Sequence, residues 1–142
     1  MRRALDTLGT AFVVMYGDSY LQCDLRDIER TFDASRRLAL MTVLRNENQW
    51  DRSNVLFDQG QLRVYDKHHP TPDMQHIDYG LGVLRAAALT RYPADTRLDL
   101  AEVYRDLLAE GELIGYEVTE RFYEIGSPEG LAETRARFES RA

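Results

Sequence analysis

The chain has 142 residues, a length typical of one domain with a hydrophobic core of its own. Its composition, 44% hydrophobic and 30% charged, is that of a globular protein rather than a disordered one. The net charge of −6, with no long basic run, argues against nucleic acid as the main partner, because phosphate neutralisation needs clustered lysine and arginine.

Cysteine content and hydropathy indicate where the protein works. Cys23 is the only cysteine, which excludes an internal disulfide and favours the reducing cytoplasm. No apolar run approaches the roughly 20 residues of a membrane span, and the first residues lack the apolar core of a secretory signal. We therefore expect a cytoplasmic protein with no membrane partner.

Apolar periodicity, capping residues and turn residues predict helices and strands that alternate along the chain. In chain order we expect a helix at 2–8, a strand at 11–16, a helix capped by Asp24, a strand at 38–44, a hairpin at 54–57 and 62–65, a strand at 77–84, a helix capped by Asp99, a strand at 113–118 and a helix that starts at Ser127 and Pro128. The first strand, helix and strand predict a βαβ unit with parallel strands. No segment resembles a linker, so we expect a single α/β domain, 1–142, with a mixed sheet.

Two acidic motifs stand out. Gly17-Asp18 follows the apolar run 11–16, which predicts a strand buried on both faces and a carboxylate at its carboxyl end, where open α/β sheets bind ligands. A second acidic segment, 123–128, contains Glu124. Alone, Asp18 is more typical of a turn or a helix cap, and Glu124 of a surface carboxylate. Together they favour a site for a divalent metal and a polyphosphate.

Four segments, taken in order, resemble the sugar-phosphate nucleotidyltransferases, which make nucleoside diphosphate sugars. They are VMYGDSYL at 14–21, VYDK at 64–67, IDYGLGVL at 77–84 and FYEIGSPEGL at 122–131. The match runs from about residue 5 to the end of the chain. Each motif alone is weak, whereas four in the family's order are fairly specific.

The resemblance implies a Rossmann-like three-layer α/β/α fold with a mixed, mainly parallel sheet. It implies Mg²⁺-dependent transfer of a nucleoside monophosphate from a nucleoside triphosphate to a sugar 1-phosphate, with release of pyrophosphate. Asp18 and Glu124 would hold the Mg²⁺, and Lys67 would hold the sugar phosphate; these three are the implied catalytic residues. The implied substrate-binding residues are Gly17, Asn54, Asp78, Tyr79 and Gly80. Of these, Asn54 and Asp78 would bond to sugar hydroxyls, and the Gly80 backbone would let the sugar lie close.

The sequence also departs from the family pattern. The family begins with a strand and a glycine-rich loop that holds the triphosphate, and this chain has no comparable glycine cluster. Glu124 stands where aspartate is usual, and Asp66-Lys67-His68 replaces glutamate-lysine-proline. Without the first strands, a sheet edge and a helix face would be uncovered, so we expect self-association through them. Two other interpretations stay open: a non-catalytic remnant that binds a sugar phosphate or a partner protein, and a structural α/β domain with no site.

Overall fold

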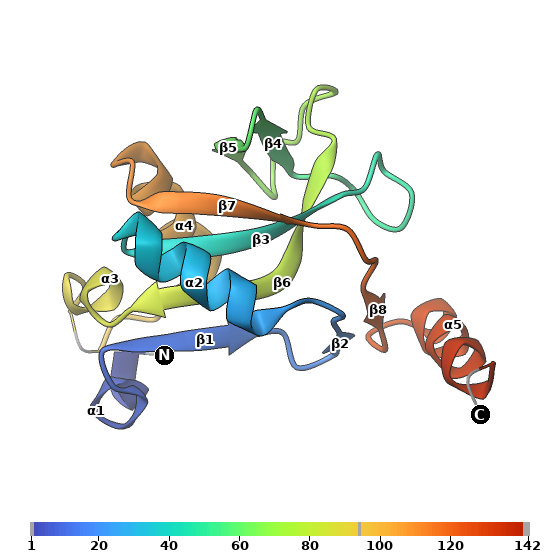
Figure 1. Cartoon of the computed structure of the whole chain (residues 1–142), viewed down its shortest axis with the longest axis horizontal. Helices are drawn as coiled ribbons and strands as arrows, with labels where there is room; N and C mark the ends of the chain where they lie inside the picture. The colour runs from blue at the N-terminus through green and yellow to red at the C-terminus, as the bar shows by residue number, and fades with distance from the viewer. Residues whose placement is uncertain (1, 94, 141–142) are drawn as a thin grey trace.

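A six-stranded mixed sheet lies at the centre of the protein, which a computed structural model describes over residues 2–93 and 95–140 (Figure 1). Its strands are β1 (Ala11–Met15), β3 (Ala39–Arg45), β4 (Val55–Asp58), β5 (Gln61–Tyr65), β6 (His76–Arg85) and β7 (Leu113–Val118). The order across the sheet is β5-β4-β6-β3-β7, and β1 pairs with the second half of β6. The long strand β6 therefore connects the β4–β5 hairpin with the rest of the sheet.

Strand directions confirm the predicted βαβ unit and show that another strand, β6, lies between its two parallel strands. β1 and β3 both pair with β6 in antiparallel register, so they run parallel to each other with β6 between them. β7 pairs with β3 in parallel register. As a result β1, β3, β4 and β7 run in one direction, and β5 and β6 run in the other.

Helices cover both faces of the sheet and produce the expected three layers. α2 (Leu25–Ser35) covers one face, where Ile28 and Phe32 are almost completely buried against β3 and β6. α3 (Ala87–Thr90) and α4 (Leu100–Ala109) cover the other face. The caps are those predicted: Asp24 accepts from the backbone at the start of α2, and Asp99 does so at the start of α4. The chain begins with a 3₁₀ turn, Arg2–Ala4, and α1 (Leu5–Leu8).

One expectation about burial is wrong. β1 is not buried on both faces, since Val13 is 54% and Met15 58% exposed. The reason is its position: among the described strands β1 pairs only with β6 and forms an edge of the sheet. Leu25 and Phe138 are also exposed on their helices, and the ring of Phe138 lies 4.9 Å, centroid to centroid, from the ring of Tyr20.

A second, two-stranded sheet was not predicted, and it joins segments from opposite ends of the chain. β2 (Ser19–Tyr20) pairs in antiparallel register with β8 (Tyr123–Glu124), which leads into α5 (Pro128–Glu139). α5 starts with Ser127 as cap and Pro128 in its first turn, as predicted, and projects beyond the main sheet (Figure 1). None of the helices in the described ranges is long and apolar enough to cross a membrane.

Candidate functional site

A cavity of about 440 Å³ lies where the end of β1 faces the β4–β5 hairpin, β6 and β8. It brings together six of the eight predicted site residues: Asp18, Asn54, Lys67, Asp78, Tyr79 and Glu124. Gly17 and Gly80 are not among its lining residues. Residues separated by more than a hundred positions in the sequence thus face one space, which makes this cavity the candidate site.

The carboxylates of Asp18 and Glu124 lie close together because the β2–β8 pairing aligns their segments. Ser19 is directly opposite Glu124, and the backbone oxygen of Asp18 accepts a hydrogen bond from the N–H of Ile125 at 2.9 Å. Oδ2 of Asp18 and Oε2 of Glu124 lie 3.1 and 3.0 Å from the point where a Cβ on Gly126 would stand. Two like charges this close repel each other, unless a cation lies between them.

Local donors hold Glu124 in this place. The Ser127 hydroxyl donates to Oε1 at 2.7 Å, and the Gly126 N–H donates to Oε2 at 2.5 Å. The hydrogen bond from Ser127, followed by those from the backbone, lowers the pKa of Glu124 below its usual value. Glycine is required at position 130, because a Cβ there would lie 1.9 Å from Oε1 of Glu124.

This pair of carboxylates fits a hard divalent cation. Neither Asp18 nor Glu124 forms an ion pair with any residue in the described ranges. Carboxylate oxygens are the ligands that Mg²⁺ prefers, usually one or two from the protein with substrate phosphates and water completing the shell. No group of three or more histidine, cysteine, aspartate or glutamate side chains in the described part of the chain could hold a metal by itself.

Lys67 supplies positive charge to the same cavity, on a turn that its neighbour stabilises. Oδ1 of Asp66 accepts from the backbone N–H groups of His68 and His69, at 2.7 and 3.0 Å, which folds the chain around Lys67. The Lys67 ammonium donates to the Tyr16 hydroxyl at 3.2 Å and lies 5.3 Å from the centroid of that ring. Lys67 is the only lysine among the chain's 18 lysines and arginines, a signal in the sequence that points to this position.

Asn54 and Asp78 line the cavity, and hydrogen bonds within the protein already use part of the bonding capacity of their polar groups. Oδ2 of Asp78 accepts from the hydroxyls of Tyr16 and Tyr65, at 2.7 and 3.2 Å, and Oδ1 accepts from the Gly80 N–H at 3.0 Å. The backbone N–H of Asp78 donates to Oδ1 of Asn54 at 3.0 Å, so this amide oxygen faces β6.

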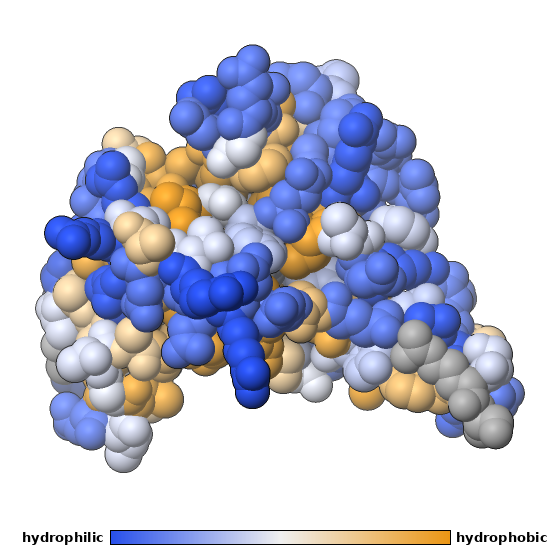
Figure 2. Space-filling model, viewed as in Figure 1, coloured by the Kyte–Doolittle hydropathy of each residue, from blue (hydrophilic) through white to orange (hydrophobic). Residues whose placement is uncertain are grey.

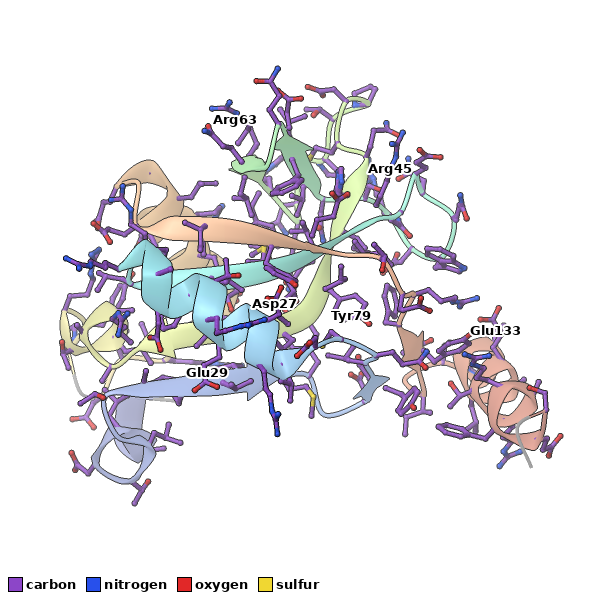
Figure 3. The ribbon with its side chains drawn as sticks, viewed as in Figure 1. Asp27, Glu29, Arg45, Arg63, Tyr79 and Glu133 are labelled. Carbon is purple, nitrogen blue, oxygen red and sulfur yellow. The ribbon has the colours of Figure 1, made fainter. Side chains whose placement is uncertain are left out.

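Gly80 and Tyr79 follow Asp78 on β6. Gly80 has φ of +90°, and Tyr16, not open space, lies over its backbone. Tyr79, labelled in Figure 3, lines the cavity. Its hydroxyl accepts from the Gln22 N–H at 2.9 Å, and its ring contacts the ring of Phe122. Burial raises the pKa of Tyr79 to about 12. Its hydroxyl therefore stays protonated at neutral pH.

Several lining residues lie outside the set of eight predicted site residues. Arg52 and Asp51 reach the cavity from the loop 46–53, which the buried side chain of Asn46 holds in place: its Nδ2 donates to the Asp51 carbonyl at 2.6 Å and to Oγ of Ser53 at 3.1 Å. Tyr16 enters from the end of β1.

Comparisons with protein-family models and with curated protein sequences give no match. Solved structures do match. One is described as a glucose-1-phosphate thymidylyltransferase from Bacillus anthracis in complex with a sucrose, and it matches with a TM-score of 0.81 and 16% sequence identity. The inositol-1-phosphate CTP transferase from T. maritima matches with a TM-score of 0.68 and 16% identity, and a UDP-glucose pyrophosphorylase from Acinetobacter baumanii with a TM-score of 0.75 and 14% identity. They are matched over 95%, 93% and 95% of this chain, which spans 57%, 56% and 53% of theirs.

The chain therefore has the fold of the sugar-phosphate nucleotidyltransferases, over slightly more than half the length of these structures. The resemblance in the four sequence motifs is confirmed at the level of fold.

Proposed function

We propose that this chain carries the metal-binding and sugar-phosphate-binding residues of a sugar-1-phosphate nucleotidyltransferase, and that it takes a nucleoside triphosphate and a sugar 1-phosphate as substrates. One observation supports this most: Asp18, Glu124 and Lys67, assigned from three separate motifs, line the same cavity. A fold shared with three structures whose descriptions name transferases of this kind or a pyrophosphorylase adds to it.

In the proposed reaction an oxygen of the sugar 1-phosphate attacks the α-phosphorus of the triphosphate. The new P–O bond forms as the bond to the β-phosphate oxygen breaks, and pyrophosphate leaves. The protein's task is to align the two phosphates and to neutralise charge rather than to form a covalent bond itself. Asn54 and Tyr79 line the same cavity as Lys67, and the sugar would lie against them.

Charge determines the proposed roles of the three ionic residues. Lys67 keeps N–H groups beyond the one donated to Tyr16, and these can bind phosphate oxygens of the sugar 1-phosphate. Asp18 and Glu124 would hold a Mg²⁺, which supplies positive charge between the protein's carboxylates and the triphosphate. Ser127 and Gly126 keep Glu124 ionised and pointed at this position.

The direct test is release of pyrophosphate from nucleoside triphosphates in the presence of Mg²⁺ and a panel of sugar 1-phosphates. Asp18→Asn should abolish the signal, and Asp58→Asn, at an exposed aspartate at the end of β4, should leave it unchanged. Activity that survives Asp18→Asn would contradict the assignment of the site. Binding of a sugar 1-phosphate without pyrophosphate release would instead support the non-catalytic interpretation.

We also propose that two copies associate through the free edge of β1. Val13 and Met15 on β1 and Leu25 on α2 are each more than half exposed, and Leu8 of α1 is 37% exposed. Figure 2 shows apolar surface on the lower part of this face, where α1 and β1 lie. An unpaired edge with exposed apolar residues pairs readily with another strand. Light scattering should give a dimer that Val13→Lys converts to a monomer; a wild-type monomer at micromolar concentration contradicts this proposal.

The compartment proposed for this reaction is the cytoplasm. Cys23 is unpaired, as in proteins kept under reducing conditions. Nucleoside triphosphates as substrates fit the same compartment.

A further inference from the structure

Asp78 is a buried carboxylate, 9% exposed, on which hydrogen bonds converge from three sides. The Tyr16 and Tyr65 hydroxyls donate to one oxygen and the Gly80 N–H donates to the other. These donors leave a sugar hydroxyl little access to either oxygen. Asp78 thus has the contacts of a group that holds other side chains in place rather than one that binds a ligand directly.

The two tyrosine hydroxyls are hydrogen-bond donors to Asp78. Both tyrosines donate to the same oxygen, which is the arrangement of a carboxylate acceptor. Burial, and then the negative charge of Asp78, raise the pKa of Tyr65 well above the usual value, so this hydroxyl keeps its proton.

Tyr16 connects this carboxylate to the lysine of the cavity. Its hydroxyl donates to Asp78 and accepts from the Lys67 ammonium, so the three groups form a chain of hydrogen bonds. The position of Tyr16 is fixed independently, because its backbone N–H donates to the Gly80 carbonyl at 2.9 Å and its ring lies against that backbone. Lys67 is exposed on its other side, toward the cavity.

We propose that Asp78 is the positioning residue of this cavity: it clamps the Tyr16 hydroxyl, which orients the Lys67 ammonium toward a ligand phosphate, and its backbone N–H orients the Asn54 amide. The phosphate ligand in this inference rests on the proposed function, whereas the clamp on Lys67 does not. Tyr65 supports Asp78 from the opposite side and does not contact Lys67.

Because the chain has one lysine, the clamp on Lys67 can be tested without an activity assay and without chemically modifying the protein. Selective isotope labelling of lysine gives one side-chain Cε signal in the NMR spectrum, that of Lys67. We expect restricted motion at this carbon in the wild type, and free averaging in Tyr16→Phe and Asp78→Asn. The matched control is Tyr116→Phe, which removes a tyrosine–aspartate hydrogen bond to Asp27 outside the cavity and should leave the signal unchanged.

Titration with inorganic phosphate separates the clamp from the proposed function. In the wild type, phosphate should shift the Lys67 signal, and either cavity variant should weaken this apparent affinity at least about tenfold, the loss expected when a charged hydrogen bond is no longer oriented. If Lys67 is mobile in the wild type, or if Tyr16→Phe leaves its motion unchanged, the clamp is contradicted. If the variants release Lys67 but phosphate never shifts its signal, the clamp stands and the proposed function fails.

Folding of the variants is checked by the backbone amide spectrum. Asp78→Asn changes a buried group that accepts three hydrogen bonds and can lower stability by itself, whereas Tyr16→Phe removes only a hydroxyl group. Should Asp78→Asn fail to fold, Tyr16→Phe alone decides the outcome.

Discussion

The ring of Tyr16 occupies the space that a side chain at position 80 would need: a Cβ on Gly80 would stand 2.9 Å from Cδ2 of Tyr16. Gly80 also has φ of +90°, a backbone conformation that residues with a side chain rarely adopt. The strand β6 therefore passes beneath Tyr16 only because residue 80 is glycine. The orientation of the Tyr16 hydroxyl toward Asp78 depends on the same contact.

Replacing this glycine should be costly. We expect Gly80→Ala to lower the free energy of unfolding by about 1–3 kcal/mol, through backbone strain and the clash with the Tyr16 ring. Gly17→Ala is the matched control, because nothing lies within 4 Å of its Cβ position and its φ is unremarkable; it should change stability by less than about 0.5 kcal/mol. Chemical denaturation measures both, and equal values for the two variants would contradict this account.

A structural feature could be predicted from the sequence when the interactions that produce it join residues close together in the chain. The caps of three helices, Asp24, Asp99 and Ser127, were predicted because a cap bonds to backbone within three residues of itself. The exposure of β1 was not, because an apolar run looks the same in a central strand and at an edge, and pairing partners lie far away in the chain.

In the candidate site, too, some features could be predicted from the sequence and others could not. The order of the motifs was enough to suggest that Asp18 and Glu124 share one site, but not that the small β2–β8 ladder aligns them. The bond from Tyr16 to Asp78 joins residues 62 positions apart and has no local signature. The sequence resemblance assigned Asp78 to the sugar, and only the fold reveals that one of its oxygens accepts from two tyrosine hydroxyls.

The loop 46–53 should depend on one buried amide. Asn46 is fully buried and bonds to Asp51 and Ser53, so Asn46→Ala leaves buried polar groups of this loop without partners. We expect a loss of about 2 kcal/mol in the free energy of unfolding. Trp50, the chain's only tryptophan, lies in this loop and stacks against Arg121. Its fluorescence should therefore shift to the red as the loop loosens.

Gln49→Ala serves as the control for this loop, since Gln49 is exposed and the side-chain amide that anchors the loop is that of Asn46. It should change neither stability nor tryptophan fluorescence appreciably. An Asn46→Ala protein with wild-type fluorescence would show that the loop keeps its place by other contacts.

The turn that carries Lys67 should loosen in acid. Backbone N–H groups of His68, and then of His69, lower the pKa of Asp66. Because the folded pKa lies below the ordinary aspartate value of about 3.9, this stabilisation is complete above that value and is lost as the pH falls through the lowered pKa. NMR amide shifts of residues 68 and 69 should therefore move together with the Asp66 carboxyl. In Asp66→Asn these shifts should no longer follow the acid titration; an unchanged titration would mean that another carboxylate governs the turn.

The identity of the basic residue at position 67 should matter, and not only its charge. Lysine places a compact ammonium against the Tyr16 hydroxyl, whereas the planar guanidinium of arginine is longer and bonds as a rigid fork. We expect Lys67→Arg to weaken binding of a sugar 1-phosphate by about tenfold, equal to about 1.4 kcal/mol, with stability unchanged. Calorimetric titration in the presence of Mg²⁺ measures this, and Arg63→Lys, on the exposed face of β5 (Figure 3), is the control that should bind as the wild type does. Wild-type affinity in Lys67→Arg would mean that charge alone suffices and that the contact with Tyr16 contributes nothing to binding.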